Sequence, residues 1–178
     1  GENSLAIYNN QGTVNENGTL EIGNGGTGIY TTGGNVNIGS NSIITTGNNS
    51  AAAVYATDNA KVTNDSSAIT IAGGSFGFVL KSGSSLTNNA SATLGDNAVY
   101  VYGDNAGTVT SSGTAAINIS GSNNVVFYTV NGGDIKNESA ITADTETIGN
   151  IAIYNKGGSI ENNGNITVGN SDIVYSGG

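Results

Sequence analysis

The stretch that decides the fold is Ile153-Tyr154-Asn155-Lys156-Gly157-Gly158-Ser159-Ile160-Glu161-Asn162-Asn163-Gly164-Asn165-Ile166-Thr167-Val168-Gly169. It contains three short β-like runs, around Tyr154, Ile160 and Ile166, and glycine, asparagine or serine separates them. Glycine and asparagine readily adopt the positive φ angles that tight corners need. Because relatives of this stretch recur along the chain, we interpret it as one unit of a repeat.

The first run of each unit is marked by a β-branched or aromatic residue followed by tyrosine. This pair occurs at Ile7-Tyr8, Ile29-Tyr30, Val54-Tyr55, Val101-Tyr102, Phe127-Tyr128, Ile153-Tyr154 and Val174-Tyr175. Between Tyr55 and Tyr102 we assign Val79-Leu80 to the same phase, with leucine in place of tyrosine. Successive spacings are then 22, 25, 25, 22, 26, 26 and 21 residues, which gives a period of about 24.

Two further apolar marks complete each unit. The second mark is a single residue: Val14, Val36, Val62, Leu86, Val109, Ile135 and Ile160. The third is an alternating run such as Leu20-Glu21-Ile22 or Ile166-Thr167-Val168, and the unit around Ile43 and Ile44 matches it only loosely. Three runs per unit indicate three sides of a coil, and stacked coils bury one continuous apolar column. We therefore predict an all-β fold, a right-handed parallel β-helix (β-solenoid) with triangular coils of about 24 residues, about seven coils and no α-helix.

The composition supports a solenoid of one domain over residues 1–178. Glycine (29) and asparagine (28) make up nearly a third of the chain, but the regular placement of Ile, Val and Tyr argues against disorder. Proline, which would interrupt the hydrogen bonds between stacked strands, is absent. Because neither end carries a capping sequence, we expect the chain to be a segment of a longer repeat protein, or its ends to stack on neighbouring chains.

The charge of the chain limits its partners. The formal net charge is −9, and the only cations are four lysines. This balance disfavours binding to nucleic acid. No run approaches the roughly 20 apolar residues of a transmembrane helix, so we expect no direct membrane insertion by this segment.

The residues available for catalysis are few. Histidine and cysteine are absent, which removes the commonest general base, the nucleophile systems that depend on it and the usual zinc sites. Three pairs of acids, Asp58 with Asp65, Asp134 with Glu138, and Asp144 with Glu146, would be the candidates for cleavage of a polysaccharide. They lie in or beside turns without clustered aromatics or arginine, so we interpret them as solvated acids. We expect no enzyme activity, no metal site and no cofactor.

Asparagine recurs two residues after the second apolar mark, at Asn64, Asn88, Asn137 and Asn162. Ser111 takes the same phase, and Glu16 and Ile38 are exceptions. Stacking the coils would align these side chains into a ladder, in which amides bond to one another and to the backbone of the corner. We predict a structural role for this ladder.

The tyrosines suggest a contact surface. By alternation, the residue before each tyrosine points inward, and the tyrosines form an outer row beside small residues such as Ala6, Gly28, Ala53 and Ala152. The row would comprise Tyr8, Tyr30, Tyr55, Tyr102, Tyr128, Tyr154 and Tyr175. If the tyrosines pointed inward instead, they would be core packing.

Motifs such as Gly28-Ile29-Tyr30-Thr31-Thr32-Gly33-Gly34 and Ala152-Ile153-Tyr154-Asn155-Lys156-Gly157-Gly158 resemble the β-helix passenger repeats of Gram-negative type V autotransporter adhesins. The resemblance covers nearly the whole chain. It implies a rod at the bacterial cell surface, anchored in the outer membrane through regions not in this chain. The rod would bind a host-cell or bacterial surface protein or glycan, or itself, and the family offers no catalytic residues to transfer. The alternatives are a filament subunit that stacks end to end and, less favoured, a β-helix enzyme that acts on polysaccharides.

Overall fold

The computed structural model describes residues 1–177 and contains 22 β-strands in three parallel sheets. No helix occurs among these residues, so none of membrane-spanning length is present in them. Sheet A contains β1 (Leu5–Asn10), β4 (Thr27–Thr32), β7 (Ala52–Thr57), β10 (Phe76–Lys81), β13 (Val99–Asp104), β16 (Val125–Val130), β19 (Ile151–Asn155) and β22 (Ile173–Gly177). Sheet B contains β2 (Thr13–Glu16), β5 (Asn35–Ile38), β8 (Lys61–Asn64), β11 (Ser85–Asn88), β14 (Val109–Ser111), β17 (Ile135–Asn137) and β20 (Ile160–Asn162). Sheet C contains β3 (Thr19–Ile22), β6 (Ile43–Thr46), β9 (Ala68–Ile71), β12 (Ala92–Leu94), β15 (Ala116–Ile119), β18 (Ala140–Ala143) and β21 (Ile166–Thr167).

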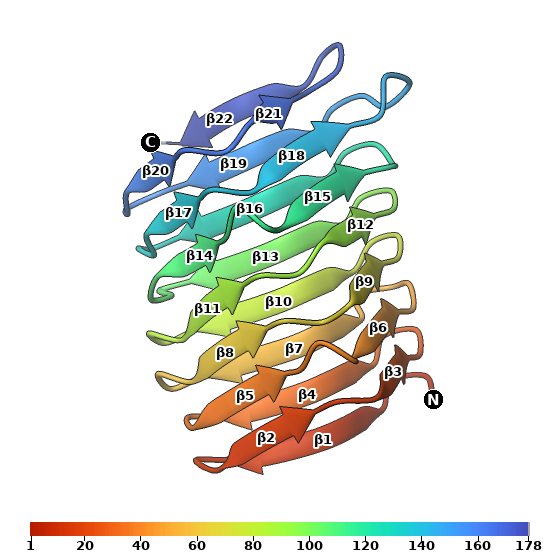
Figure 1. Cartoon of the computed structure of the whole chain (residues 1–178), viewed down its shortest axis with the longest axis vertical. Coiled ribbons are helices and arrows are strands. Elements are labelled where there is room, and N and C mark those ends of the chain that lie inside the picture. The colour runs from red at the N-terminus through yellow and green to blue at the C-terminus, as the bar shows by residue number, and fades with distance from the viewer. Residues whose placement is uncertain (178) are drawn as a thin grey trace.

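Each coil contributes one strand to each sheet before the chain climbs to the next coil. Neighbouring strands in every sheet are therefore one coil apart in sequence, as in the order β1-β4-β7 of sheet A. Figure 1 shows about seven coils stacked from the N-terminus to the C-terminus, with sheet A behind sheets B and C. The predicted parallel β-solenoid, with about 24 residues per turn and three sides, is confirmed.

The core is a column of aliphatic and aromatic side chains inside the coils. Sheet A contributes an inward row that includes Ile29, Phe78 and Phe127, and all three are fully buried. Sheets B and C face it with the second and third apolar marks, such as Leu86 and Ile117. Burying one such side chain contributes about 1.5–3 kcal/mol, so the stacked column supplies the stability that a single coil lacks.

The three corners of the coil are built in two ways. The corners before and after sheet A use left-handed backbone, for example Asp58 and Asn59, both with φ of 60°, and Gly34 with φ of 70°. A side chain at Gly34 would collide with the carbonyl oxygen of Gly12 on the coil below, so this corner also needs glycine for space. Among residues 1–177, no residue between a sheet B strand and the following sheet C strand has positive φ. That third corner is held by side chains instead, as described below.

Strand register corrects one assignment in the sequence pattern. Tyr55 and Tyr102 both pair with Val79, so the interrupted tyrosine phase falls on Val79 and not on Leu80. Leu80 points into the core, in register with Ala56 below and Gly103 above. The aromatic Phe78 takes the place that Phe127 has before Tyr128, so the true pair in this coil is Phe78-Val79.

The loosely matching second unit is a regular coil. Ile44 pairs with Leu20 and Ile69, and Thr46 pairs with Ile22. Thr46 is buried where other coils carry aliphatic side chains, and its hydroxyl accepts a hydrogen bond from the Ala72 backbone at 2.9 Å. Thr46 makes the repeat hard to recognise in the sequence, because it replaces an aliphatic residue and its hydrogen-bonding partner, the Ala72 N–H, lies a full coil away.

Candidate contact face

The outer face of sheet A carries two adjacent rows of apolar or aromatic side chains, which we call the contact face. One is the tyrosine row, which consists of Tyr8, Tyr30, Tyr55, Val79, Tyr102, Tyr128 and Tyr154 in register. The other, three residues earlier in each strand, consists of Leu5, Thr27, Ala52, Phe76, Val99, Val125, Ile151 and Ile173. Apart from Val79 and Ala52, which their neighbours cover, these side chains are partly or largely exposed.

The tyrosine row is a stack of aromatic rings along the rod. Ring centroids are 5.8 Å apart between Tyr8 and Tyr30, and 5.0 Å between Tyr30 and Tyr55. Beyond Val79 the separations are 5.5 Å from Tyr102 to Tyr128 and 4.7 Å from Tyr128 to Tyr154. Within these four pairs the planes are inclined by 26° or less, so the rings lie nearly parallel and point outward. The neighbours shield Tyr128 from water and raise its pKa, and repulsion from ionised Tyr154 and Tyr102 adds to the rise.

Tyr175 does not belong to this row. It pairs with Ile153, a core residue, whereas Ser176 takes the phase of Tyr154. Tyr175 therefore lies on the inward phase of β22, where it lines a hollow with Ile160 and Asn162 at the C-terminal end of the described chain. The pair motif assigned Tyr175 wrongly because the last unit is shifted by one residue, so that Tyr175 takes the place of the residue before the tyrosine.

Three of the four small residues that the sequence placed beside the tyrosines lie inside the coil. Gly28, Ala53 and Ala152 are buried, and a Cβ added at Gly28 would contact Leu20 and Ile22 in the core. Two consecutive residues of each sheet A strand thus face inward, which breaks strict alternation. The neighbours of the tyrosines on the outside are instead the residues three positions earlier.

Tyr100 belongs to none of the repeat marks, and it is fully buried in the structure. Its ring packs edge-on against Phe78 at 5.6 Å and Phe127 at 6.5 Å, and its hydroxyl donates to Asn88 Oδ1 at 2.8 Å. Gly77, one coil below, makes room, since a Cβ there would lie 2.9 Å from the Tyr100 ring. Burial raises the pKa of Tyr100 well above its ordinary value, so this tyrosine belongs to the core and not to the contact face.

The asparagine row lies inside the corner between sheets B and C. Asn64, Asn88 and Asn137 are fully buried and in register, with Ser111 between the last two. Asn64 Nδ2 donates to Asn88 Oδ1 at 2.9 Å, and Asn137 Nδ2 donates to Asn162 Oδ1 at 2.7 Å. The same side chains bond the corner backbone two residues on, as from Asn88 Nδ2 to the Ala90 carbonyl at 3.0 Å. The row therefore replaces the left-handed residues that hold the other two corners, and it is not accessible to a ligand.

The three acidic pairs lie on the surface, and all six side chains are exposed. Asp65 accepts a hydrogen bond from Asn89 at 2.7 Å, and Asp134 accepts two from Ser159. The hydroxyl and the backbone N–H of Ser159 lower the pKa of Asp134, which stabilises its charged form rather than preparing it to release or take up a proton. In the described part of the chain no group of three or more acidic side chains is placed to hold a metal ion.

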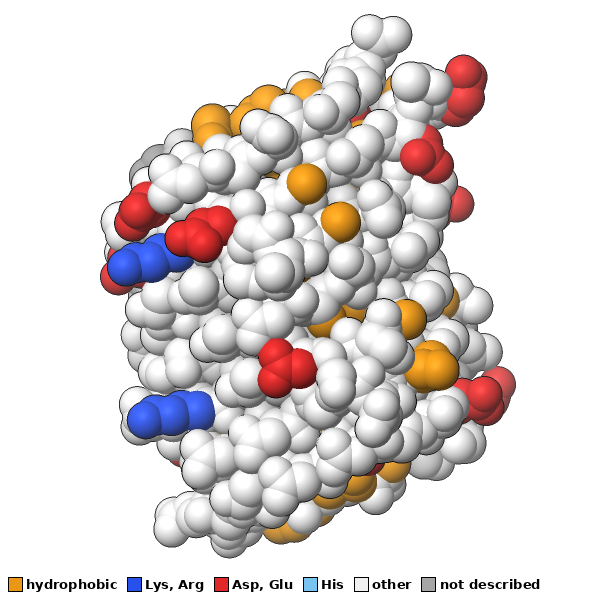
Figure 2. Space-filling view, viewed as in Figure 1, with side chains coloured by type: hydrophobic (Ala, Val, Ile, Leu, Met, Phe, Trp, Pro, Cys, Tyr) orange, Lys and Arg blue, Asp and Glu red, His pale blue; other side chains and the backbone are white. Residues whose placement is uncertain are grey.

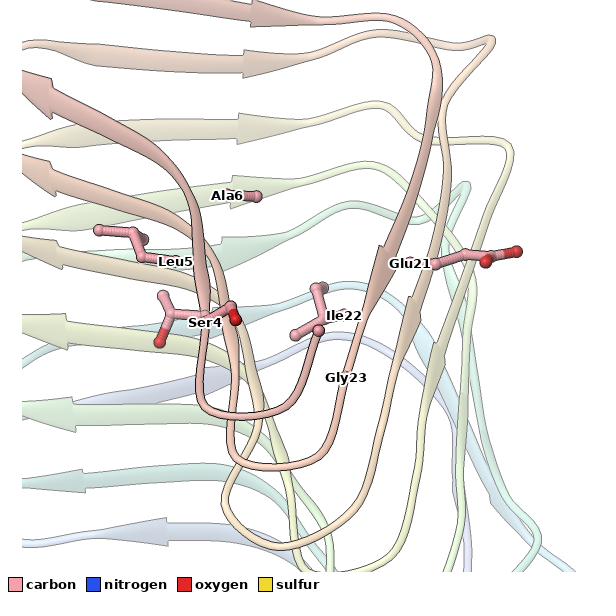
Figure 3. Close-up of a pocket in the computed structure, with 8 residues that line it drawn as sticks. Ser4, Leu5, Ala6, Glu21, Ile22 and Gly23 are labelled. Carbon is pink, nitrogen blue, oxygen red and sulfur yellow. The ribbon is translucent and has the colours of Figure 1, made fainter.

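The rest of the surface differs from the contact face. Figure 2 shows the side formed by sheets B and C, where most side chains are polar and hydrophobic ones are scattered or gather toward the two ends. At the N-terminal end, a shallow hollow of about 150 Å³ lies between the first turn and Ile22. Figure 3 shows Leu5 and Ile22 on its two sides, with the Glu21 side chain directed away. This hollow is the open end of a coil and brings together no reactive groups.

Comparison with models of protein families, with curated protein sequences and with solved structures found no significant match to the chain. The function is therefore inferred from the chain's own surface.

Proposed function

We propose that the chain is a non-catalytic contact module of a bacterial cell surface, a β-helix passenger segment of a Gram-negative type V autotransporter adhesin. In this proposal it binds a protein or glycan of host cells or of other bacteria, or a second copy of itself. The observation that carries the proposal is the contact face, where a stacked tyrosine row runs beside an apolar row along the rod. A largely apolar exposed surface along one side of a rod is typical of an interaction site.

The chemistry of the contact face suits adhesion to large partners. Tyrosine offers an apolar ring and a hydroxyl that can bond to a polar group, which is why it is enriched at interfaces. Because the row repeats once per coil, a partner with several matching groups would make many weak contacts whose strengths combine. The motifs around Tyr30 and Tyr154, which resemble autotransporter passenger repeats, support placing this rod outside the cell.

The experiment is a cell-binding assay with two matched double variants. Tyr30→Thr/Tyr128→Thr removes two outward rings and introduces β-branched side chains, which suit strands. The control, Thr70→Ala/Thr142→Ala, changes two exposed side chains on the outer face of sheet C. We expect the tyrosine variant to lose at least about tenfold in binding to cells or in self-association, and the control to retain it.

Equal binding by the two variants would exclude the contact face as the adhesive surface. Light scattering of the same proteins over a concentration series tests the alternative function. Growth of fibres with concentration, retained in the tyrosine variant, would favour a filament subunit that stacks coaxially end to end. Isolated rods would exclude that alternative.

A further inference from the structure

The tyrosine row has one gap, at Val79. Parallel strands lie about 4.8 Å apart, so Tyr55 and Tyr102, on either side of Val79, are separated by about 9.6 Å along the rod. A ring placed midway would lie about 4.8 Å from each, within the 4.5–7 Å range of favourable aromatic pairs. This spacing also matches the 4.7–5.8 Å separations in the rest of the stack.

The gap is an open groove of about 270 Å³. Tyr55 and Tyr102 line it on either side of Val79, which is 7% exposed, and Thr27, Ser50 and Ala52 extend it along the apolar row toward the N-terminal coils. Phe76 forms one wall, and its ring lies edge-on to the Tyr102 ring at a centroid distance of 6.2 Å. The groove stays open beside Phe76 because the residue paired with it on the preceding coil, Ala52, has a small side chain. The groove is therefore an aromatic slot that no side chain among the described residues fills.

A single cation lies beside the slot. Lys81 is the one charged side chain among the residues that line the groove. Asp104 lies in register with Lys81 on the next strand, but it does not line the groove, and its carboxylate accepts a hydrogen bond from Asn131. Asp104 offsets part of the Lys81 charge, so what Lys81 offers an anionic group of a partner is mainly a hydrogen-bond donor.

We propose that this slot binds one aromatic side chain of a partner protein, inserted between Tyr55 and Tyr102 with a neighbouring carboxylate of the partner on Lys81. The inserted ring completes the stack, and Val79 and Phe76 exclude water around it. An aromatic anchor in a desolvated pocket is the usual centre of binding energy at a protein interface. The inference deepens the proposed contact function and rests on it for the nature of the partner.

The test is a titration with blocked dipeptides, followed by NMR on the methyl groups of Val79. N-acetyl-aspartyl-tyrosinamide should give saturable shifts at Val79, and N-acetyl-aspartyl-leucinamide should bind at least about tenfold more weakly, because two ring contacts are lost. Lys81→Gln should reduce the affinity for the aspartyl dipeptide to that of N-acetyl-glycyl-tyrosinamide. Equal binding of the leucine and tyrosine probes would overturn the proposal, and so would tighter binding of methyl β-glucoside, which would indicate a sugar site.

Two variants on the outer face of sheet A test the stacking, since one fills the slot and the other opens a gap elsewhere in the tyrosine row. Val79→Tyr completes the stack and should abolish binding of the tyrosine dipeptide. Tyr128→Val opens a gap between Tyr102 and Tyr154 without a lysine, because Val130 takes the phase of Lys81, and it should create a second, weaker site there for N-acetyl-glycyl-tyrosinamide. Retained binding in folded Val79→Tyr, or no second site in Tyr128→Val, would contradict the stacking argument; the second variant decides if the first does not fold.

The outcomes separate this inference from the proposed function. Dipeptide binding at Val79 in a protein that does not bind cells would leave the slot in place and remove the adhesin proposal. Cell binding that is lost in Tyr30→Thr/Tyr128→Thr, together with no dipeptide binding, would do the reverse.

Discussion

Replacing Asn88 by alanine tests whether buried amides hold the third corner of each coil. The Asn88 side chain is fully buried and makes four hydrogen bonds. Its Oδ1 accepts from Asn64 Nδ2 at 2.9 Å and from the Tyr100 hydroxyl at 2.8 Å, and its Nδ2 donates to Ala90 O at 3.0 Å and to Ser111 Oγ at 3.1 Å. Asn88→Ala removes Oδ1, the acceptor that the buried Asn64 amide and the buried Tyr100 hydroxyl share.

The magnitude follows from those two donors. A buried group left without a partner costs about 1–3 kcal/mol, so the Asn64 amide and the Tyr100 hydroxyl together predict a loss of about 2–6 kcal/mol in the free energy of unfolding. The adjacent Asn89 is a matched control, because its amide bonds Asp65 on the exposed side of the same corner. Asn89→Ala should cost no more than about 0.5 kcal/mol.

The assay is urea unfolding followed by far-ultraviolet circular dichroism and by tyrosine fluorescence, which must coincide before a two-state free energy is assigned. Tyr100→Phe removes only the hydroxyl and should cost about 1 kcal/mol. The double variant Asn88→Ala/Tyr100→Phe should then lose less than the sum of the single changes, because one hydrogen bond is counted in both. Equal losses for Asn88→Ala and Asn89→Ala would refute the argument that the buried row carries stability.

Three further predictions concern a corner, the core and the surface. Gly74→Ala, which meets open space at φ of 68°, should cost about 1–2 kcal/mol, and Gly34→Ala should cost more because its Cβ also strikes backbone of the coil below; thermal unfolding of both variants measures the difference. Above about pH 10 tyrosine loses its proton in the unfolded chain, whereas buried Tyr100 keeps its proton in the folded chain. The free energy of unfolding should therefore fall above that pH by about 1.4 kcal/mol per pH unit. Urea unfolding at a series of pH values should show a smaller fall per pH unit in Tyr100→Phe. Ser159→Ala should raise the pKa of Asp134 toward its ordinary value, since the hydroxyl bond is lost while the backbone bond remains, and an NMR titration of the Asp134 carboxyl measures the change; an unchanged pKa would exclude the hydroxyl as a cause.

The fold class, the length of the repeat and the place of the asparagine row could all be predicted from the sequence. These features follow from local periodicity, because every coil must present apolar residues at the same phase to stack on the next. Asn64 and Asn88 repeat at the distance of one coil, and the structure places them in hydrogen-bonding contact. The outward direction of Tyr30 and Tyr128 also agrees with the alternation of a strand.

The residues that become neighbours across coils are evident only in the three-dimensional structure. The phase of Val79 and the inward position of Tyr175 depend on strand register, which pairs residues a full coil apart. Coils of unequal length keep this register because their extra residues lie in the corners. Tyr100 could not be assigned from sequence, because its burial requires the small Gly77 on one coil and the acceptor Asn88 on another side of the rod. The slot at Val79 likewise exists only when stacking brings Tyr55 and Tyr102 to either side of it, since no local pattern encodes a gap between two coils.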